Sequence, residues 1–165
     1  MLTADTLQLE ITEDPPPGAL SRIVGMQAEW YAVNWGFGRL FEAKVATEVG
    51  AYALAQPHPD CRTWVVRDAI GVAGSITIDG RDTPVARLRW FFVEERARGG
   101  LGGRLLDRAL TFCRERGFRE IWLTTFDGLH AARRLYERAG FTLEHQAFDT
   151  TWGVEVQEQL FRLRL

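Results

Sequence analysis

Residues 85–110 read VARLRWFFVEERARGGLGGRLLDRAL, and the interpretation of the whole chain starts from this stretch. The β-branched and aromatic residues of 85–93 predict a strand. That strand leads into four glycines among residues 99–103, and an apolar repeat of three to four residues then predicts a helix that ends at Gly117. Glycines allow a tight turn and let a ligand approach main-chain atoms closely.

The start of this helix is a candidate anion site. The first turn leaves about four N–H groups without intrahelical partners, and with the helix dipole these groups suit a phosphate or pyrophosphate. Neither the GxGxxG pattern of dinucleotide-binding folds nor the GxxxxGK[ST] pattern of P-loops is intact here. A glycine-rich turn that only connects two elements is the alternative.

The same periodicities assign elements on both sides of this stretch. Helices are predicted over 19–31, 39–55 and 130–139, a loop over 34–38, and further strands over 7–11, 63–66, 72–79, 120–125, 142–148 and 154–163. Three successive strands indicate an antiparallel meander, whereas a strand–helix–strand unit indicates a parallel pair. The predicted fold is therefore a mixed α/β sheet.

Composition narrows the class of protein. The 165 residues are 46% hydrophobic and 25% charged, as in an ordinary globular protein. No apolar run approaches the ~18 residues that cross a membrane. The first fourteen residues carry four acidic and no basic side chains, unlike a targeting peptide. A net charge of −2 argues against a general nucleic-acid binder. We therefore predict one cytoplasmic domain over 1–165, with no membrane or nucleic-acid partner.

Metal and disulfide chemistry are not expected. The two cysteines, Cys61 and Cys113, lack CxxC spacing and are too few for a disulfide framework. The three histidines, His58, His130 and His145, do not fall at i, i+4 on one predicted helix. We therefore predict no metal site.

Two motifs carry a resemblance to a known family. Residues 98–106 (RGGLGGRLL) and 131–141 (AARRLYERAGF) resemble the two signature motifs of the GNAT N-acetyltransferase superfamily. Residues 87–93 (RLRWFFV) and Trp152 further resemble the acetyltransferase half of proteins fused to MarR-type regulators. The resemblance implies the GNAT acyl-CoA N-acyltransferase fold. That fold is a twisted sheet of six or seven strands with about four helices, splayed between its two central parallel strands.

The resemblance also implies a donor site for acetyl-CoA, the expected co-substrate. The pantetheine arm would pair with open backbone groups of the strand at Phe91, Phe92 and Val93. The pyrophosphate would be held by seven consecutive residues, namely Arg98, Gly99, Gly100, Leu101, Gly102, Gly103 and Arg104. The family's loop motif can be set on this segment in two registers, one residue apart, and each departs from the motif. With its glycines on Gly100 and Gly102, Ala97 takes the Arg/Gln position, and with its arginine on Arg98, Leu101 takes the first glycine position.

For catalysis, the resemblance points first to Tyr136. It matches the family tyrosine that sits near the thioester sulfur and can protonate the departing thiolate. Several family members carry a glutamate within the strand before the loop, but this strand has Arg87 and Arg89 instead. Glu94, at the end of that strand, is our candidate general base. The other candidates are Glu95, Glu42, Asp127, His130 and a water chain.

The acceptor is expected to be an amine of a small molecule or peptide. By the same resemblance, Tyr31, Trp35 and Phe37 would line its site, although these aromatic residues could instead pack the two first helices together. Because the strand carboxylate is missing, a non-catalytic acyl-CoA-binding or sensing module is the alternative function. The last strand, 154–163, could pair across a homodimer or lie inside the sheet.

Overall fold

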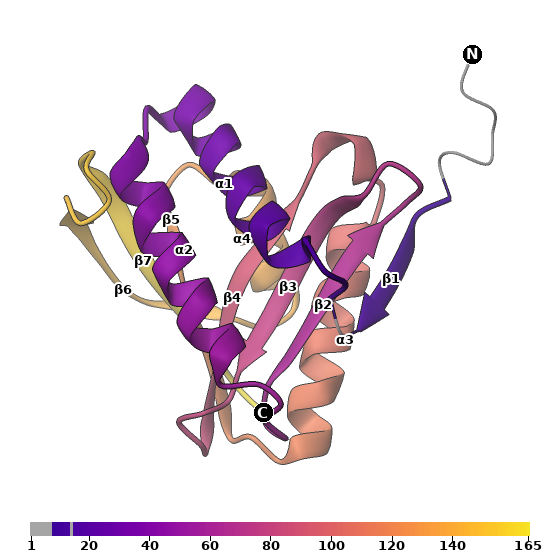
Figure 1. The fold of residues 1–165 in the computed structure, drawn as a ribbon. Helices are drawn as coiled ribbons and strands as arrows, with labels where there is room; N and C mark the ends of the chain where they lie inside the picture. Colours follow the sequence, from indigo (N-terminus) through magenta and orange to yellow (C-terminus); the bar gives the residue numbers. More distant parts are fainter. Residues whose placement is uncertain (1–7, 14) are drawn as a thin grey trace.

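A mixed sheet organises the chain in the computed structural model, which describes residues 8–13 and 15–165. In this part of the chain, seven strands pair in the order β1-β2-β3-β4-β5-β7-β6 (Figure 1). They are β1 (Glu10–Glu13), β2 (Arg62–Arg67), β3 (Val72–Asp79), β4 (Val85–Val93), β5 (Glu120–Phe126), β6 (Thr142–Asp149) and β7 (Val156–Arg164). The β4–β5 pair is parallel and the other five pairs are antiparallel. The predicted fold class is confirmed.

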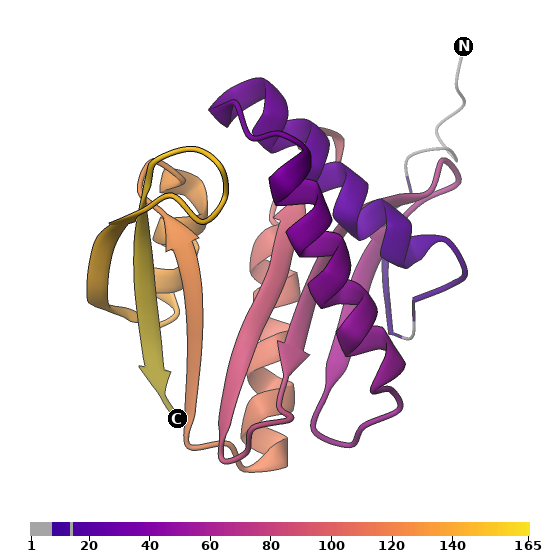
Figure 2. The same ribbon diagram turned by 60° about the vertical axis from the view of Figure 1, so that its left-hand side comes forward.

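Helices cover both faces of the sheet (Figure 2). On one face lie α1 (Ala19–Trp35) and α2 (Arg39–Leu54), which share an apolar core with β2, β3 and β5 side chains. On the other face lie α3 (Leu101–Arg116) and α4 (His130–Arg138), with a second and larger core. A short 3-10 turn, Glu95–Ala97, joins β4 to the glycine segment. The two cores are therefore separated by the sheet.

Helix α3 forms where the apolar repeat predicts it. Its buried side chains are Leu101, Leu105, Leu106, Ala109, Leu110, Phe112 and Cys113, one stripe at helical spacing. Gly117 ends the helix with φ of 76°, and its N–H donates to the carbonyl of Arg114. A left-handed glycine after the last turn is the common helix stop.

The structure corrects some predicted boundaries. Helix α1 continues to Trp35, so the predicted loop over 34–38 shortens to Gly36, Phe37 and Gly38. Residues 32–34 are exposed, and an apolar repeat cannot detect a helical turn that has no buried face. Among the described residues the first strand spans Glu10–Glu13, and residues 8 and 9 are not part of it. Leu7, the first residue of the predicted strand, lies outside the described residues.

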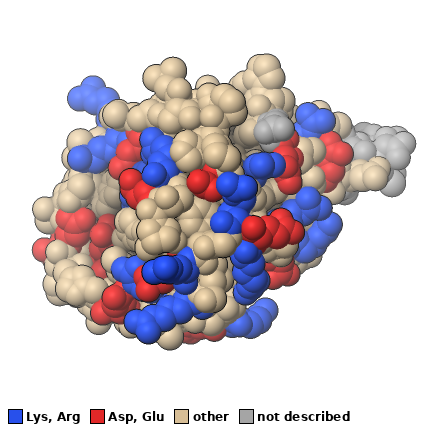
Figure 3. Space-filling view, turned by 90° about the horizontal axis from the view of Figure 1, so that it is seen from below, with Lys and Arg blue, Asp and Glu red and all other residues tan. Residues whose placement is uncertain are grey.

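Two surface features bear on partners. Seven of the eight residues of β6, the strand at one edge of the sheet, are exposed. On the face seen in Figure 3, basic and acidic side chains are interspersed rather than separated into regions of one sign.

None of the helices in the described residues has the length and apolar character needed to cross a membrane.

Candidate active site

The parallel strands β4 and β5 pair at only one end. Their register runs from Val85 opposite Glu120 to Arg87 opposite Trp122 and stops there. Beyond this point the strands diverge (Figure 2). The remaining six residues of β4, from Leu88 to Val93, therefore have no β5 partner, although β3 still pairs with β4 on its other side.

A β-bulge in β4 accompanies this divergence. Ser75 pairs with Phe92 and Thr77 pairs with Arg89, so β4 contains one residue more than β3 over this interval. Within the bulge, Trp90 has φ of 48°, and its carbonyl accepts a hydrogen bond of 2.8 Å from Ser75 Oγ. Few non-glycine residues adopt this conformation. A bulge bends its strand and redirects side chains, which separates this end of β4 from β5.

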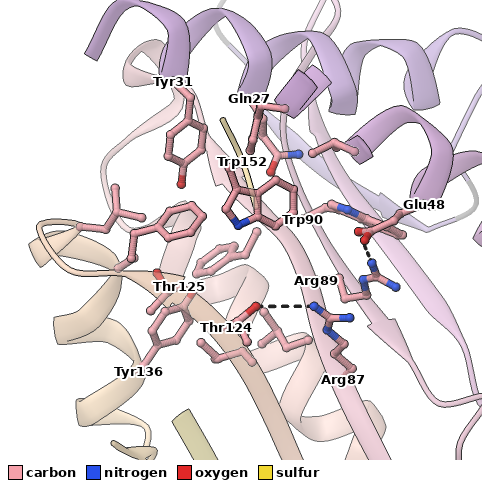
Figure 4. Close-up of a pocket in the computed structure, with 18 residues that line it drawn as sticks. Gln27, Tyr31, Glu48, Arg87, Arg89, Trp90, Thr124, Thr125, Tyr136 and Trp152 are labelled. Carbon is pink, nitrogen blue, oxygen red and sulfur yellow. Dashed lines mark hydrogen bonds and ion pairs between the residues drawn. The ribbon is translucent and has the colours of Figure 1, made fainter. Parts of the chain in front are cut away.

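A cavity of about 130 Å³ lies where the strands diverge. From the α1–α2 core it is lined by Tyr31, Phe41, Val45, Trp90, Phe126, Leu129 and Trp152, and from the α3–α4 core by Leu88, Phe91, Leu123, Ala132 and Tyr136. Its polar lining comprises Gln27, Glu48, Arg87, Arg89, Thr124 and Thr125 (Figure 4). The cavity therefore connects the two faces of the sheet, so two molecules could meet in it from opposite sides.

Tyr136 enters this cavity from α4. The residue is 5% exposed, and its ring packs against Phe91, Phe141 and Phe161 at centroid distances of 6.0, 5.8 and 6.2 Å. Burial, with a smaller contribution from Tyr31, raises the pKa of the Tyr136 phenol above its usual value. The phenol is therefore protonated at neutral pH, and burial makes it a weaker acid than a free phenol. Its place in the cavity is what makes it a candidate proton donor.

The glycine segment forms an open loop before α3. Gly99 and Gly100 have φ of 115° and 92°, and a Cβ on either would meet no atom within 4 Å. Gly100 caps α3 without any side-chain hydrogen bond, and the first turn carries no acidic residue. The helix start therefore exposes main-chain amides and no opposing negative charge, which fits a pyrophosphate.

The later glycines connect this loop to the cavity. A Cβ on Gly102 would lie 3.3 Å from Leu135 of α4 and 3.7 Å from Phe91, while Gly103 faces Leu135 at 4.0 Å. Leu101 points into the core and is 7% exposed, whereas Arg98 and Arg104 are exposed. A ligand running from the loop toward Phe91 would thus reach the cavity.

Glu94, the predicted base, lies away from the cavity lining. It directly follows β4 and forms ion pairs with Arg22 of α1 and with Arg96, the latter at 2.9 Å. Its backbone N–H donates to Ala73 at 2.8 Å. Both carboxylate oxygens of Glu94 are therefore engaged by guanidinium groups outside the cavity.

The predicted acceptor residues separate into two groups. Tyr31 lines the cavity, but Trp35 and Phe37 do not. Phe37 is 3% exposed and stacks on Tyr31 at 5.2 Å, and Trp35 packs edge-on against Tyr31 at 5.8 Å. Trp35 and Phe37 therefore pack against Tyr31 on the side away from the cavity.

Phe92, a predicted donor-site residue, has its side chain on the α1 side of the sheet. Its ring centroid lies 6.1 Å from that of Trp30.

Sequence reasoning did not assign the polar lining of the cavity. Gln27, Glu48 and Thr124 carry no motif, and nothing in the sequence singles them out. Arg87 and Arg89 did carry a signal, because two charged residues alternate with apolar ones on a strand in the middle of a sheet. Such charges are rarely buried without a partner. Within the described residues, no group of three or more His, Cys, Asp and Glu side chains could hold a metal ion.

A sheet that splays between two parallel strands beside a glycine-rich helix start defines the class of acyl-CoA-dependent acetyltransferases. A family model described as "Acetyltransferase (GNAT) family" matches residues 26–141. The chain belongs to this family, and it is an acetyltransferase that uses acetyl-CoA as its acetyl donor. No curated protein matches the chain.

Solved structures share the fold across nearly the whole chain. A GNAT-family acetyltransferase from Staphylococcus aureus is 17% identical, with a TM-score of 0.71, and the match covers 94% of this chain and 99% of that one. An acetyltransferase from Streptococcus agalactiae is 22% identical, with a TM-score of 0.70 and coverages of 95% and 98%. A Salmonella typhimurium protein solved with acetyl-CoA is 17% identical, with a TM-score of 0.72 and coverages of 95% and 94%. At these identities the similarity establishes the fold.

Proposed function

We propose that the chain transfers the acetyl group directly to an amine held in the cavity, with Tyr136 as the proton donor. The amine nitrogen attacks the thioester carbonyl carbon, a C–N bond forms and the C–S bond breaks. Tyr136 gives its proton to the thiolate sulfur, and the amine loses one proton to base. The observation that carries this proposal is the buried phenol of Tyr136, which lines the cavity where β4 and β5 diverge.

The donor side uses main-chain groups. Amides of residues 98–104 would hold the pyrophosphate, with Arg98 and Arg104 adding positive charge. The unpaired edge of β4 at Phe91, Phe92 and Val93 would pair with the pantetheine amides as an added strand would. An N–H of this bulged segment would stabilise the oxyanion. Acetyl-CoA itself supplies the activated acetyl thioester.

The general base remains a prediction. Glu94 was selected from the sequence, but its ion pairs with Arg22 and Arg96 favour water in the cavity as the proton acceptor. Glu48 is the carboxylate among the described residues that line the cavity, and it is paired with Arg89. On the acceptor side we retain Tyr31 as a contact residue and assign Trp35 and Phe37 to its support.

The extent of the domain, its location, its relatives and its dimer contact are proposed from the same observations. We propose one domain over 1–165, located in the cytoplasm and related to the acetyltransferase half of MarR-type fusions. Supporting this relation, Arg87, Arg89, Trp90, Phe91 and Trp152 of the resembling segments all line the cavity. A homodimer would use the exposed edge strand β6, since β7 is paired on both sides.

The test of this function is a comparison of two tyrosine variants. Tyr136→Phe should lower kcat by about 10²-fold or more, because it removes the proton donor, while acetyl-CoA binds with a nearly unchanged Kd. Free thiol released from acetyl-CoA is followed across a panel of amines. Tyr52→Phe is the matched control, since Tyr52 is also a buried phenol but does not line the cavity.

Two results would contradict the proposal. Equal rates for Tyr136→Phe and wild type would remove Tyr136 from catalysis. Tight acetyl-CoA binding without turnover on any amine would favour the alternative, a non-catalytic acyl-CoA-binding module.

A further inference from the structure

Two arginines lie on the acceptor side of the cavity. Arg87 and Arg89 alternate along β4 with Ala86 and Leu88, whose side chains enter the α3–α4 core. Because successive side chains of a strand point to opposite faces, both guanidinium groups lie on the α1–α2 face (Figure 4). Tyr136 lies on the other face of the sheet. Both guanidinium groups are therefore on the face where we place the acceptor amine.

Arg89 has its charge compensated within the protein. Its Nη1 is 3.4 Å from Asp79 Oδ2, and its Nη2 forms an ion pair with Glu48 of α2. The side chain is 10% exposed. Arg89 therefore has a structural reason to be buried.

Arg87 has no such ion pair within the described residues. Its guanidinium lies 4.5 Å from the centre of the Trp122 ring, and Nη2 donates to Thr124 Oγ1 at the long distance of 3.5 Å. Its Nε is buried and has no hydrogen-bond partner. Among the described residues, no carboxylate lies within 4.0 Å of this side chain. A buried charged donor without an acceptor is destabilising, because it has lost its water and gained no protein partner.

Three carboxylates favour the charged Arg87 from beyond ion-pair distance. Asp79 accepts two hydrogen bonds of 2.8 Å from Arg81 besides its contact with Arg89, and Glu48 pairs with Arg89. Glu158 accepts one long hydrogen bond, of 3.4 Å, from Trp152 Nε1. Since none of the three meets the Arg87 nitrogens, a direct partner would come from a molecule that enters the cavity.

We infer that the acceptor amine also carries a carboxylate, so that the substrate class is a small amino acid whose carboxylate binds Arg87. A planar guanidinium matches a carboxylate with two parallel hydrogen bonds. Trp122 and Thr124 orient the guanidinium, and the aromatic wall formed by Tyr31, Trp90, Phe126 and Trp152 takes the apolar part of the substrate. This inference rests on the proposed function, because it names the acceptor of that same site.

The experiment compares each acceptor with its uncharged analogue. Thiol release is measured for the twenty amino acids and β-alanine, each beside its carboxamide. The acids should be the better substrates, and Arg87→Gln should raise their KM by about 10²-fold while leaving the KM of the amides unchanged. Arg87→Lys should restore part of the loss. Arg108→Gln, on the exposed face of α3, is the matched control.

A second variant guards against misfolding of Arg87→Gln. Thr124→Val keeps the guanidinium but removes its hydroxyl acceptor, so it should raise the KM of the acids by a smaller factor. Amides that match or exceed the acids as substrates would overturn the inference and leave the acetyltransferase intact.

The absence of turnover on every amine would instead count against the proposed function. Calorimetry with the CoA-loaded protein then decides the inference separately. If the amino acids bind and their amides do not, and if Arg87→Gln abolishes this binding, the inference is supported. No binding of any acid would overturn it.

Discussion

At the scale of single residues, the loop before α3 depends on two glycines. Gly99 and Gly100 have φ of 115° and 92°, where a side chain is disfavoured by contact between Cβ and the backbone. Space is not the constraint, because a Cβ at either position would meet no atom within 4 Å. The open space is instead where we expect the pyrophosphate.

Gly100→Ala should therefore lower the free energy of unfolding by about 1–2 kcal/mol and weaken acetyl-CoA binding. The reason is that alanine pulls the loop out of the left-handed conformation that aims the amides. Chemical denaturation and calorimetry with acetyl-CoA measure the two effects. Gly50→Ala in the exposed middle of α2, also with no atom within 4 Å, should stabilise by about 0.5–1 kcal/mol. An unchanged acetyl-CoA affinity in Gly100→Ala would contradict the proposed cradle.

At the scale of elements, strand β4 performs two tasks. Its first residues pair with β5, while its bulged end leaves a sheet edge unpaired, where we propose that the donor binds. The bulge is held by one hydrogen bond, from Ser75 Oγ of β3 to the carbonyl of Trp90. Backbone conformations such as that of Trp90 persist only when neighbouring contacts enforce them. The position of the β4 backbone that we propose for donor binding thus depends on a side chain of the adjacent strand.

Ser75→Ala should lower kcat/KM for acetyl transfer clearly, although it should lower the free energy of unfolding only slightly. The lost hydrogen bond costs about 1 kcal/mol of stability, but the freed bulge also misplaces the amides of β4. Thr63→Val is the control, since it removes a buried hydrogen bond of 2.8 Å to Thr77 from β2, a strand that does not pair with β4. Steady-state kinetics and denaturation are compared for both. Equal kinetic losses in the two variants would argue against a role for the bulge.

At the scale of the whole molecule, one charged network joins the sheet to the helical layer. Asp79 at the end of β3 binds Arg81 and Arg89, and Arg89 in turn reaches Glu48 of α2. Burial alone would raise the pKa of Asp79, but hydrogen bonds and ion pairs from Arg81, and then Arg89, hold it below its usual value. The charged form of Asp79 is therefore favoured by folding.

A carboxyl group whose pKa is lower in the folded than in the unfolded state stabilises the protein at pH values above its unfolded-state pKa of about 4. This stabilisation is lost as the pH falls through the folded-state pKa. The free energy of unfolding should thus decrease below about pH 4. Asp79→Asn should lower it by about 3 kcal/mol at pH 7, because two guanidinium groups lose a partner, and this difference should shrink in acid. Denaturation curves from pH 7 to pH 3 measure it, with exposed Asp82→Asn as control. A difference that is constant with pH would refute the assignment.

The sequence by itself determined the order of the elements, the parallel β4–β5 pair, the glycine turn before α3 and the family, which its two motifs carry. These features are local, because apolar periodicity and glycine conformation act over a few neighbouring residues. It also predicted Tyr136, on a motif helix, as a site residue, and Tyr136 lies in the cavity lining. It did not identify the last turn of α1, where no side chain is buried.

Only the tertiary structure decided which polar side chains meet. Gln27, Glu48, Arg87, Thr124 and Trp152 come from five separate segments and converge on one cavity. Their meeting depends on where β4 and β5 stop pairing and on a one-residue bulge. The same geometry directs Glu94 toward Arg22 and Arg96 and away from the cavity. Register and strand separation arise from contacts between distant segments, so no local pattern in the sequence records them.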